Sequence, residues 1–256
     1  MRIFAVPAAL LLGCCIYMPL PTARDHLFRL LDRAYSAFLR LFTRRTGRTD
    51  DVPALLSFLL LLCGMLALLG AIHPLVCMAL MAPTFTGLCV LPRCVAIKDE
   101  LDSGKYARDI PAYEALVRET CASLAPAFVQ GIISPLLLGA LGMPLHLGAA
   151  LTGIYTAAQV LSARLPAAAK TAAWVHRISD RLFVFFLVIC AGVVGRNPLH
   201  TKGSSAQARL VNILSIDEGS THAPMAGDIA QGVFLCAFSS AILCFALCAV
   251  GFVLCR

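Results

Sequence analysis

Residues 120–163 read TCASLAPAFVQGIISPLLLGALGMPLHLGAALTGIYTAAQVLSA, a stretch without Asp, Glu, Lys or Arg between Glu119 and Arg164. A helix needs about 20 apolar residues to cross the hydrocarbon core of a bilayer, so this stretch is long enough for two crossings. We predict two membrane-spanning helices, over residues 121–141 and 144–162, with a hinge at Gly142-Met143-Pro144. The fold class that follows is an all-α, polytopic membrane helical bundle.

The same stretch differs from a plain lipid-facing helix, because it is rich in glycine, proline and polar residues. Small and helix-breaking residues are tolerated at membrane depth where neighbouring protein or a cavity satisfies the freed backbone groups. We therefore predict a buried site here. Three residues have predicted structural roles: Gly131 in a close approach of helices, and Pro135 and Pro144 in broken helices.

The composition of the whole chain agrees with a membrane location. Hydrophobic residues make up 59% of the 256 residues, charged residues make up 14%, and the mean hydropathy is +0.83. Soluble domains average about 45–50% apolar and 25% charged residues. A soluble domain of this length could not cover its surface with so few polar side chains, so we predict one integral membrane domain over residues 1–256.

The formal net charge of +7 is interpreted as a sign of membrane topology. Arginines concentrate near the start of the chain and then occur singly, and no basic run alternates with stacking aromatic residues as in a nucleic-acid groove. Basic residues of membrane proteins collect in cytoplasmic loops and set the orientation. The sequence therefore argues against a nucleic-acid partner and for a lipid bilayer as the main partner.

Twelve cysteines occur, and most of them lie in apolar runs, where cysteine behaves as a small hydrophobic residue. No paired C-x-x-C motifs occur, and no histidine stands at zinc-ligand spacing from a cysteine. The sequence therefore predicts neither a disulfide framework nor a metal site.

Two N-terminal segments precede the clear membrane spans. Residues 3–20 are apolar and fit a cleaved signal, a lipoprotein signal or a membrane segment; we favour a retained, re-entrant segment because only Arg2 offers a charge before the apolar run. Residues 22–48 carry leucines and aromatic residues at helical spacing, with arginines on the other side. This pattern predicts an amphipathic helix, which lies either on lipid headgroups or on the helical bundle.

The other spans follow from hydropathy. Pro83 interrupts the span near residues 75–92, and the span near residues 182–195, at about 14 residues, is short for a full crossing. Together with the two spans of the charge-free stretch they give about five or six transmembrane or re-entrant segments. The additional spans are predicted near residues 53–72, 75–92, 182–195 and 232–255.

These spans define a topology. Residues 196–231 are rich in Gly, Ser and Thr and are predicted to form a polar loop outside the membrane. The passes at 53–72 and 75–92, and then the hairpin at 121–162, each return the chain to the same side of the membrane, so the basic segments 21–51, 93–119 and 163–181 fall together on that side. The positive-inside rule assigns that side to the cytoplasm, so we expect a multi-pass protein of the bacterial inner membrane.

Several motifs in the second half of the chain match one known family. Gly131-Ile132-Ile133-Ser134-Pro135-Leu136 is followed by Leu-Gly-Met-Pro-Leu at 141–145, by Arg181-Leu182 before an apolar run, and by Asp228-Ile229 before the last span. In this order they resemble the block E-N-T-x-D-G-[IV]-I-A-P-L, a P-L turn, P-A-R-L and D-I-x-R-A of the cobalamin biosynthesis family CobD/CbiB. The resemblance covers about half of the chain, mainly residues 119–195 and 224–256.

The CobD/CbiB proteins are adenosylcobinamide-phosphate synthases, so the resemblance implies a multi-pass membrane enzyme that forms an amide bond with ATP and Mg²⁺. In that reaction a propionate side chain of adenosylcobyric acid is activated by phosphoryl transfer and attacked by the amine of aminopropanol phosphate. Carboxylates would hold the metal, and cationic donors would neutralise phosphate oxygens. A corrinoid would then be a ligand, and other membrane or cobalamin-pathway proteins would be partners.

The chain departs from the family at the positions that carry this chemistry. The family residues are Glu, Asn and Asp in the first block, Lys, Asn and Asp in the next helix, two Asp before P-A-R-L, and a following Asn. In the same order, this chain has Pro126, Ala127, Gln130, Ala150, Gly153, Thr156, Ala172, Ala173 and His176. The carboxylates and the lysine are lost while glycines and prolines persist, which indicates a retained fold and a removed chemistry.

A few ionisable residues remain as candidates. Arg108, Asp109 and Arg181 are the surviving charges that resemble the family pattern, with interfacial ion pairing or snorkelling as their alternative role. His146 and His176 are the ionisable groups nearest the predicted cavity. No catalytic triad, P-loop or dinucleotide fingerprint occurs. Catalytic and cofactor-binding residues therefore stay unassigned.

Three hypotheses follow for function. The first is a degenerate paralogue without synthase activity that serves as a membrane partner or scaffold. The second is an active synthase with a rebuilt site, and only this hypothesis needs ATP and Mg²⁺. The third is a small-molecule carrier or a signalling protein similar to the AmpE family, since broken helices at the membrane midplane are typical of ligand sites.

Overall fold

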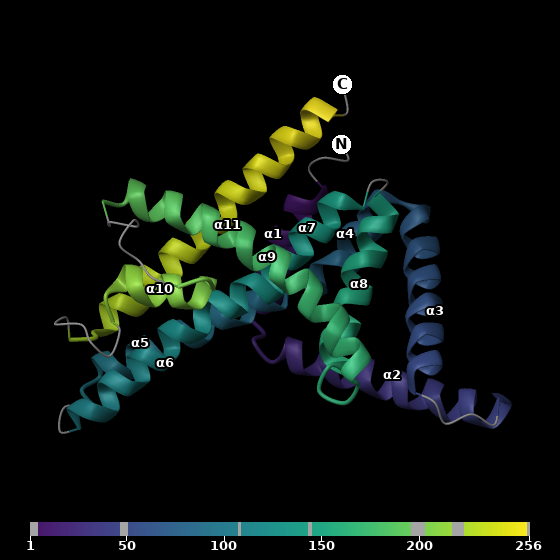
Figure 1. Ribbon diagram of the computed structural model, residues 1–256, viewed down its shortest axis with the longest axis horizontal. Coiled ribbons are helices and arrows are strands. Elements are labelled where there is room, and N and C mark those ends of the chain that lie inside the picture. Colours follow the sequence, from purple (N-terminus) through teal and green to yellow (C-terminus); the bar gives the residue numbers. More distant parts are fainter. Residues whose placement is uncertain are drawn as a thin grey trace.

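The computed structural model describes residues 5–46, 51–106, 109–142, 145–195, 203–216 and 223–254, and all regular structure in these ranges is helical (Figure 1). The predicted all-α fold is therefore confirmed for the described residues. In chain order the helices are α1 Ala5–Tyr17, α2 Ala23–Thr46, α3 Asp51–Ile72, α4 Pro74–Met81, η2 Ala82–Thr84, η3 Thr86–Cys89, α5 Val90–Asp102, α6 Ile110–Phe128, η4 Val129–Ile133, α7 Ser134–Leu141, α8 Leu145–Leu161, α9 Pro166–Val193, α10 Ala206–Leu214 and α11 Ala226–Leu254.

The most buried long element is the continuous helical stretch 110–141, which joins α6, η4 and α7 and is called the central stretch below. In its most apolar window 67% of the residues are buried, against 17% for α3 and 28% for α11. Helices α8, α9, α10 and α11 and the short helix η3 pack around it. The first half of the charge-free sequence is thus enclosed mainly by protein.

The central stretch widens at η4, where residues 129–133 form a π-helix. Pro135 has no N–H to donate to the carbonyl of Gly131, four residues earlier, so the α-helical hydrogen-bond pattern is interrupted here. The Ser134 hydroxyl donates to the Val129 carbonyl at 2.9 Å and lies 2.8 Å from the hydroxyl of Ser179 on α9. Both serines are fully buried, and this contact holds the widened turn against α9.

The short helix η3 crosses the π-helix at two glycines, Gly87 and Gly131. A Cβ atom on Gly87 would lie 2.5 Å from the carbonyl oxygen of Ala127, and one on Gly131 would overlap the backbone of Gly87. These neighbours are backbone atoms, which cannot turn aside as a flexible side chain can. The two helical segments therefore approach this closely only where both residues lack a side chain.

The segment that contains Gly87 is itself broken. Residues 74–84 and 86–102 form two helical parts that meet at 48°. Pro83 lies at the break, where its ring and its missing N–H prevent a regular helix from continuing. The Tyr17 hydroxyl donates to the Pro83 carbonyl, so α1 packs directly against the break.

Within the described residues, three helices are long and apolar enough to cross a membrane: α3, the central stretch, and residues 226–250 of α11. The bent pair over 74–102 brings the number to four if it forms one span. Helices α1 and α8 are apolar but shorter, with 13 and 17 residues. A surface suited to lipid runs along α3, where the exposed side chains are Leu56, Leu60, Leu61, Met65, Leu68, Leu69 and Ile72.

Two segments contain more helix than the sequence analysis predicts. The basic segment 163–181 is helical from Pro166, because α9 runs through it to Val193. The polar loop 196–231 contains α10, whose buried residues Leu210 and Leu214 pack in the larger core. Charged residues on the exposed side of α9 masked its apolar face in the hydropathy pattern.

Replacing Gly131 with alanine should lower the free energy of unfolding by roughly 1–3 kcal/mol, because the added methyl group overpacks the crossing with Gly87. Gly64→Ala is the matched control, since a Cβ atom there meets nothing within 4 Å and alanine favours a helix. Thermal unfolding in a mild detergent, followed by circular dichroism, compares the two variants. Equal melting temperatures would contradict the close crossing.

Candidate functional site

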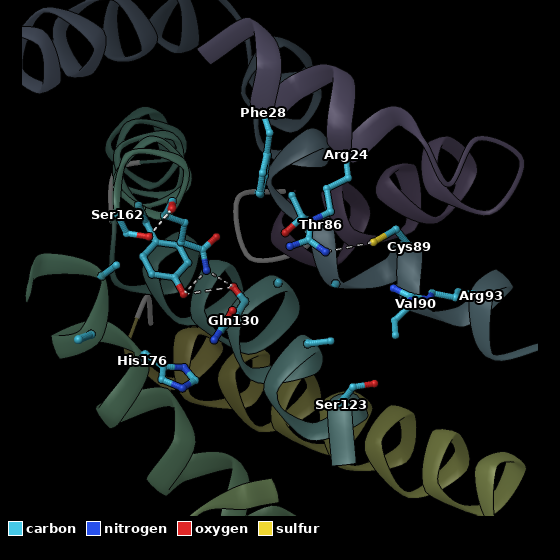
Figure 2. Close-up of a pocket in the computed structure, with 17 residues that line it drawn as sticks. Arg24, Phe28, Thr86, Cys89, Val90, Arg93, Ser123, Gln130, Ser162 and His176 are labelled. Carbon is cyan, nitrogen blue, oxygen red and sulfur yellow. Dashed lines mark hydrogen bonds between the residues drawn. The ribbon is translucent and has the colours of Figure 1, made fainter. Parts of the chain in front are cut away.

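A cavity of about 430 Å³ lies where α2, η3, α5, the central stretch, α8 and α9 meet (Figure 2). Ligand pockets in proteins span about 300–1,000 Å³, so this cavity has room for a small molecule. Its lining mixes polar side chains with glycine and alanine, and it draws on residues as far apart in the sequence as Arg24 and His176. The fold, and no single motif, creates this site.

One wall of the cavity is built on the π-helix. The Tyr155 hydroxyl of α8 donates to the backbone carbonyl of Gln130 at 3.2 Å, and Gln159 Nε2 donates to the same carbonyl at 3.3 Å. Gln159 Nε2 also donates to the Tyr155 hydroxyl at 2.8 Å. A π-helical turn displaces carbonyls from the regular pattern, and here two side chains from α8 satisfy one of them.

Two arginines line another side of the cavity. Arg24 of α2 lies with its guanidinium carbon 5.0 Å from the centroid of the Phe28 ring, and its NH1 atom lies 3.9 Å from Cys89 Sγ. Arg93 enters from α5, and Figure 2 shows both arginines on the side opposite His176. Among the residues that the structure describes, no Asp or Glu lines the cavity. The site is therefore suited to an anion.

His176 lines the cavity from α9. Burial lowers the pKa of His176 below its usual value, and the carboxylate of Asp180 opposes this shift only in part. The imidazole is therefore neutral at pH 7. Its Nδ1 atom is buried and has no hydrogen-bond partner among the described residues, so the ring carries one unsatisfied polar atom.

The nine positions singled out by the resemblance to the CobD/CbiB pattern fall into two groups in the structure. Ala127, Gln130, Ala172, Ala173 and His176 all line the cavity. The other four positions, at 126, 150, 153 and 156, are not among its lining residues. Two separate segments of the chain, 127–130 and 172–176, thus converge on one cavity with side chains that offer no carboxylate and no amine.

The predicted site residues are less concentrated. Gly131 lines the cavity at the crossing with Gly87, and Pro135 is buried near the start of α7. Asp109 caps α6 by accepting a hydrogen bond from the Ala112 amide at 3.0 Å, and Arg181 is exposed on α9. Neither of these two charges lines the cavity. Arg108 and Pro144 lie outside the described residues.

His146 is half-buried on α8 and does not line the cavity. Lining residues that sequence reasoning missed include Arg24, Phe28, Arg93 and Tyr155. Arg24 and Phe28 belong to a helix interpreted only as amphipathic, and Arg93 directly follows a predicted span. A charge at the edge of a hydrophobic run was the available signal for Arg93, but hydropathy does not say which cavity such a residue faces.

Metal-ligating groups do not gather in the described part of the chain. No group of three or more His, Cys, Asp or Glu side chains is arranged to hold a metal ion among these residues. The cysteines within the described ranges are free thiols.

Comparison with known proteins adds no relative, because no family model, no curated protein and no solved structure matches the chain.

Proposed function

We propose that this chain is a multi-pass membrane protein of CobD/CbiB type that has kept a ligand cavity and lost the synthase chemistry. The observation that carries the proposal is the convergence of Ala127, Gln130, Ala172, Ala173 and His176 on one cavity. These are positions where the family has Asn, Asp, two Asp and Asn. Their meeting in one place supports the resemblance, and their side chains argue against catalysis.

The residues present do not fit ATP with Mg²⁺. Magnesium is bound through carboxylates and phosphate oxygens, and phosphoryl transfer depends on such a metal and on cationic groups held in place. The two arginines could neutralise phosphate, but no carboxylate lines the cavity among the described residues. An active synthase would need a metal site built from another part of the molecule, so this alternative has less support.

The proposed membrane arrangement has five or six transmembrane or re-entrant segments in a bacterial inner membrane. It counts α8 and the second half of α9 in addition to α3, the bent pair over 74–102, the central stretch and α11, and it places α2 as an amphipathic helix at the interface. Figure 1 supports it, since α2, the end of α8, the end of α5 and the start of α6 lie along the lower edge of the view. These parts carry the basic segments assigned to the cytoplasm.

A second candidate function is binding of a small anion. Arg24 and Arg93 line the cavity without a carboxylate to neutralise them there, and arginine recognises phosphate with paired donors. The volume of about 430 Å³ lies in the lower part of the range for ligand pockets, which favours a small phosphate-bearing molecule over a whole corrinoid. Such binding would suit a carrier, a scaffold or a signalling protein similar to AmpE.

Expression of this chain should not restore cobalamin-dependent growth to a strain that lacks the adenosylcobinamide-phosphate synthase. The reason is that no carboxylate for the metal and no lysine lines the cavity among the residues that the structure describes. An active family synthase, expressed at the same level in the same strain, is the control that must restore growth. Growth supported by this chain would overturn the loss of synthase chemistry.

Aminopropanol phosphate should raise the melting temperature of the full chain in detergent, and Arg93→Gln should weaken its apparent affinity by about tenfold, the effect of losing one charged hydrogen bond. Arg181→Gln is the control, because Arg181 is exposed on α9 outside the cavity. The anion site would be refuted if the unaltered chain showed no shift, or if both variants lost affinity equally. Cobinamide, tested in parallel, reports whether the site takes a corrinoid.

A further inference from the structure

Helix α2 presents two exposed stripes on the side that faces away from the bundle. The first is apolar and is formed by Leu30, Ala34, Ala37 and Leu41, of which Leu30 is 64% exposed and Leu41 is 61% exposed. Two leucines left this open on a helix that already buries its other face call for an explanation, because the aqueous side of an ordinary surface helix is polar.

The second stripe is basic and runs beside the first. It consists of Arg29, Arg33, Arg40 and Arg44, all of which are exposed. The spacings of four and seven residues keep these arginines on one face of the helix, as spacings of three and four keep the apolar stripe together. An apolar stripe flanked by a row of cations is the pattern of a helix that lies in a membrane interface.

Of the two acidic residues of α2, Asp25 is exposed one turn before Arg29, and Asp32 pairs away from the basic stripe. Asp32 Oδ1 forms an ion pair with Arg164 NH1 at 3.0 Å, which ties α2 to the segment that follows α8. Arg29 donates to the backbone carbonyl of Asp25, and Arg40 donates to that of Ser36. Within the described ranges no carboxylate pairs with any of the four arginines of the basic stripe, so their charges are open to an external anion.

Contacts of the inner face of α2 with α3 fix the direction in which its outer face points. Tyr35 is buried, and its ring lies 5.3 Å from that of Phe58 on α3, while the Phe38 ring lies 5.6 Å from the same Phe58 ring. Leu161 and Leu165 complete this smaller hydrophobic core. Because the aromatic contacts lock the inner face to α3, rotation of α2 about its axis cannot hide the leucines of the outer face.

The position of α2 at the end of a membrane span indicates what covers its outer face. Figure 1 shows α2 lying across the lower ends of α3 and α8 at a steep angle to both. Helix α3 is long and apolar enough to cross a membrane, and it begins at Asp51, shortly after α2 ends at Thr46. A helix that crosses the end of a membrane span lies at the level of the lipid headgroups.

We propose that the outer face of α2 binds acidic phospholipid headgroups. Leu30 and Leu41 would enter the boundary between headgroups and acyl chains, while the arginines reach lipid phosphates from the side, with their alkyl stems along the apolar stripe. Guanidinium groups bind phosphate through paired donors, and juxtamembrane arginines prefer an anionic leaflet. The proposal depends on the membrane arrangement proposed above, and it does not depend on the cavity or on the family resemblance.

The test uses the full chain in bilayers that contain equal parts of phosphatidylcholine and phosphatidylglycerol, with either lipid carrying bromine as a fluorescence quencher. The chain has one tryptophan, so Trp174→Phe combined with Leu30→Trp gives a single fluorophore in the apolar stripe. Brominated phosphatidylglycerol should quench it at least about twofold more than brominated phosphatidylcholine, because arginines near a surface enrich anionic lipid. Added salt should reduce the difference.

Two further variants complete the design. Adding Arg33→Gln, Arg40→Gln and Arg44→Gln should abolish the preference for phosphatidylglycerol, and the salt titration of the variant with intact arginines provides the same test if these changes impair folding. Leu60→Trp in the Trp174→Phe background is the matched control, since Leu60 is 72% exposed on α3 and has no basic stripe beside it. It should be quenched equally by both lipids.

The outcomes separate the possible failures. Equal quenching of the Leu30→Trp fluorophore by both lipids, with intact arginines and at low salt, would overturn acidic-lipid binding. Quenching of Leu60→Trp but not of Leu30→Trp by either lipid would show that the outer face of α2 meets water or another protein, which also overturns it. Absence of quenching in both variants would instead refute the membrane arrangement itself.

Discussion

The backbone contact between Gly87 and Gly131 determines how the broken helix pair over residues 74–102 meets the central stretch. Apolar side chains gain little by packing together inside a lipid environment, so helices associate there through close backbone approach and hydrogen bonds. At this crossing two residues without side chains allow an approach that no other pair permits. The cavity lies beside the same crossing, and both glycines line it.

Interruption of regular helix geometry connects the fold to the site. Pro135 removes a hydrogen-bond donor from the central stretch, residues 129–133 widen into a π-helix, and the Gln130 carbonyl then accepts hydrogen bonds from Tyr155 and Gln159. A straight α-helix would have kept that carbonyl within its own ladder and presented a flat surface to α8. The π-helical turn therefore provides both a tight packing contact and a polar wall for a ligand.

Much of this could be predicted from the pattern of the chain, and the reasons are local. The spans at 53–72 and 232–255 follow from apolar length alone, and the break near Pro83 follows from the missing N–H of proline. The sequence analysis missed the helix in 163–181, because charges on one face of a helix cancel the apolar signal of the other face in a hydropathy average. It also missed α10 within 196–231, because α10 is a short helix of nine residues inside a polar segment.

The sequence by itself determined that the chain is helical, that several segments are apolar enough to cross a bilayer, and that no Asp, Glu, Lys or Arg occurs between Glu119 and Arg164. These properties depend on composition and on short-range spacing. Only the tertiary structure decided that Arg24 and Arg93 face the same cavity as Gln130 and His176. That grouping depends on where distant helices cross, and crossing positions are set by packing contacts such as Gly87 with Gly131, which leave no periodic signal along the chain.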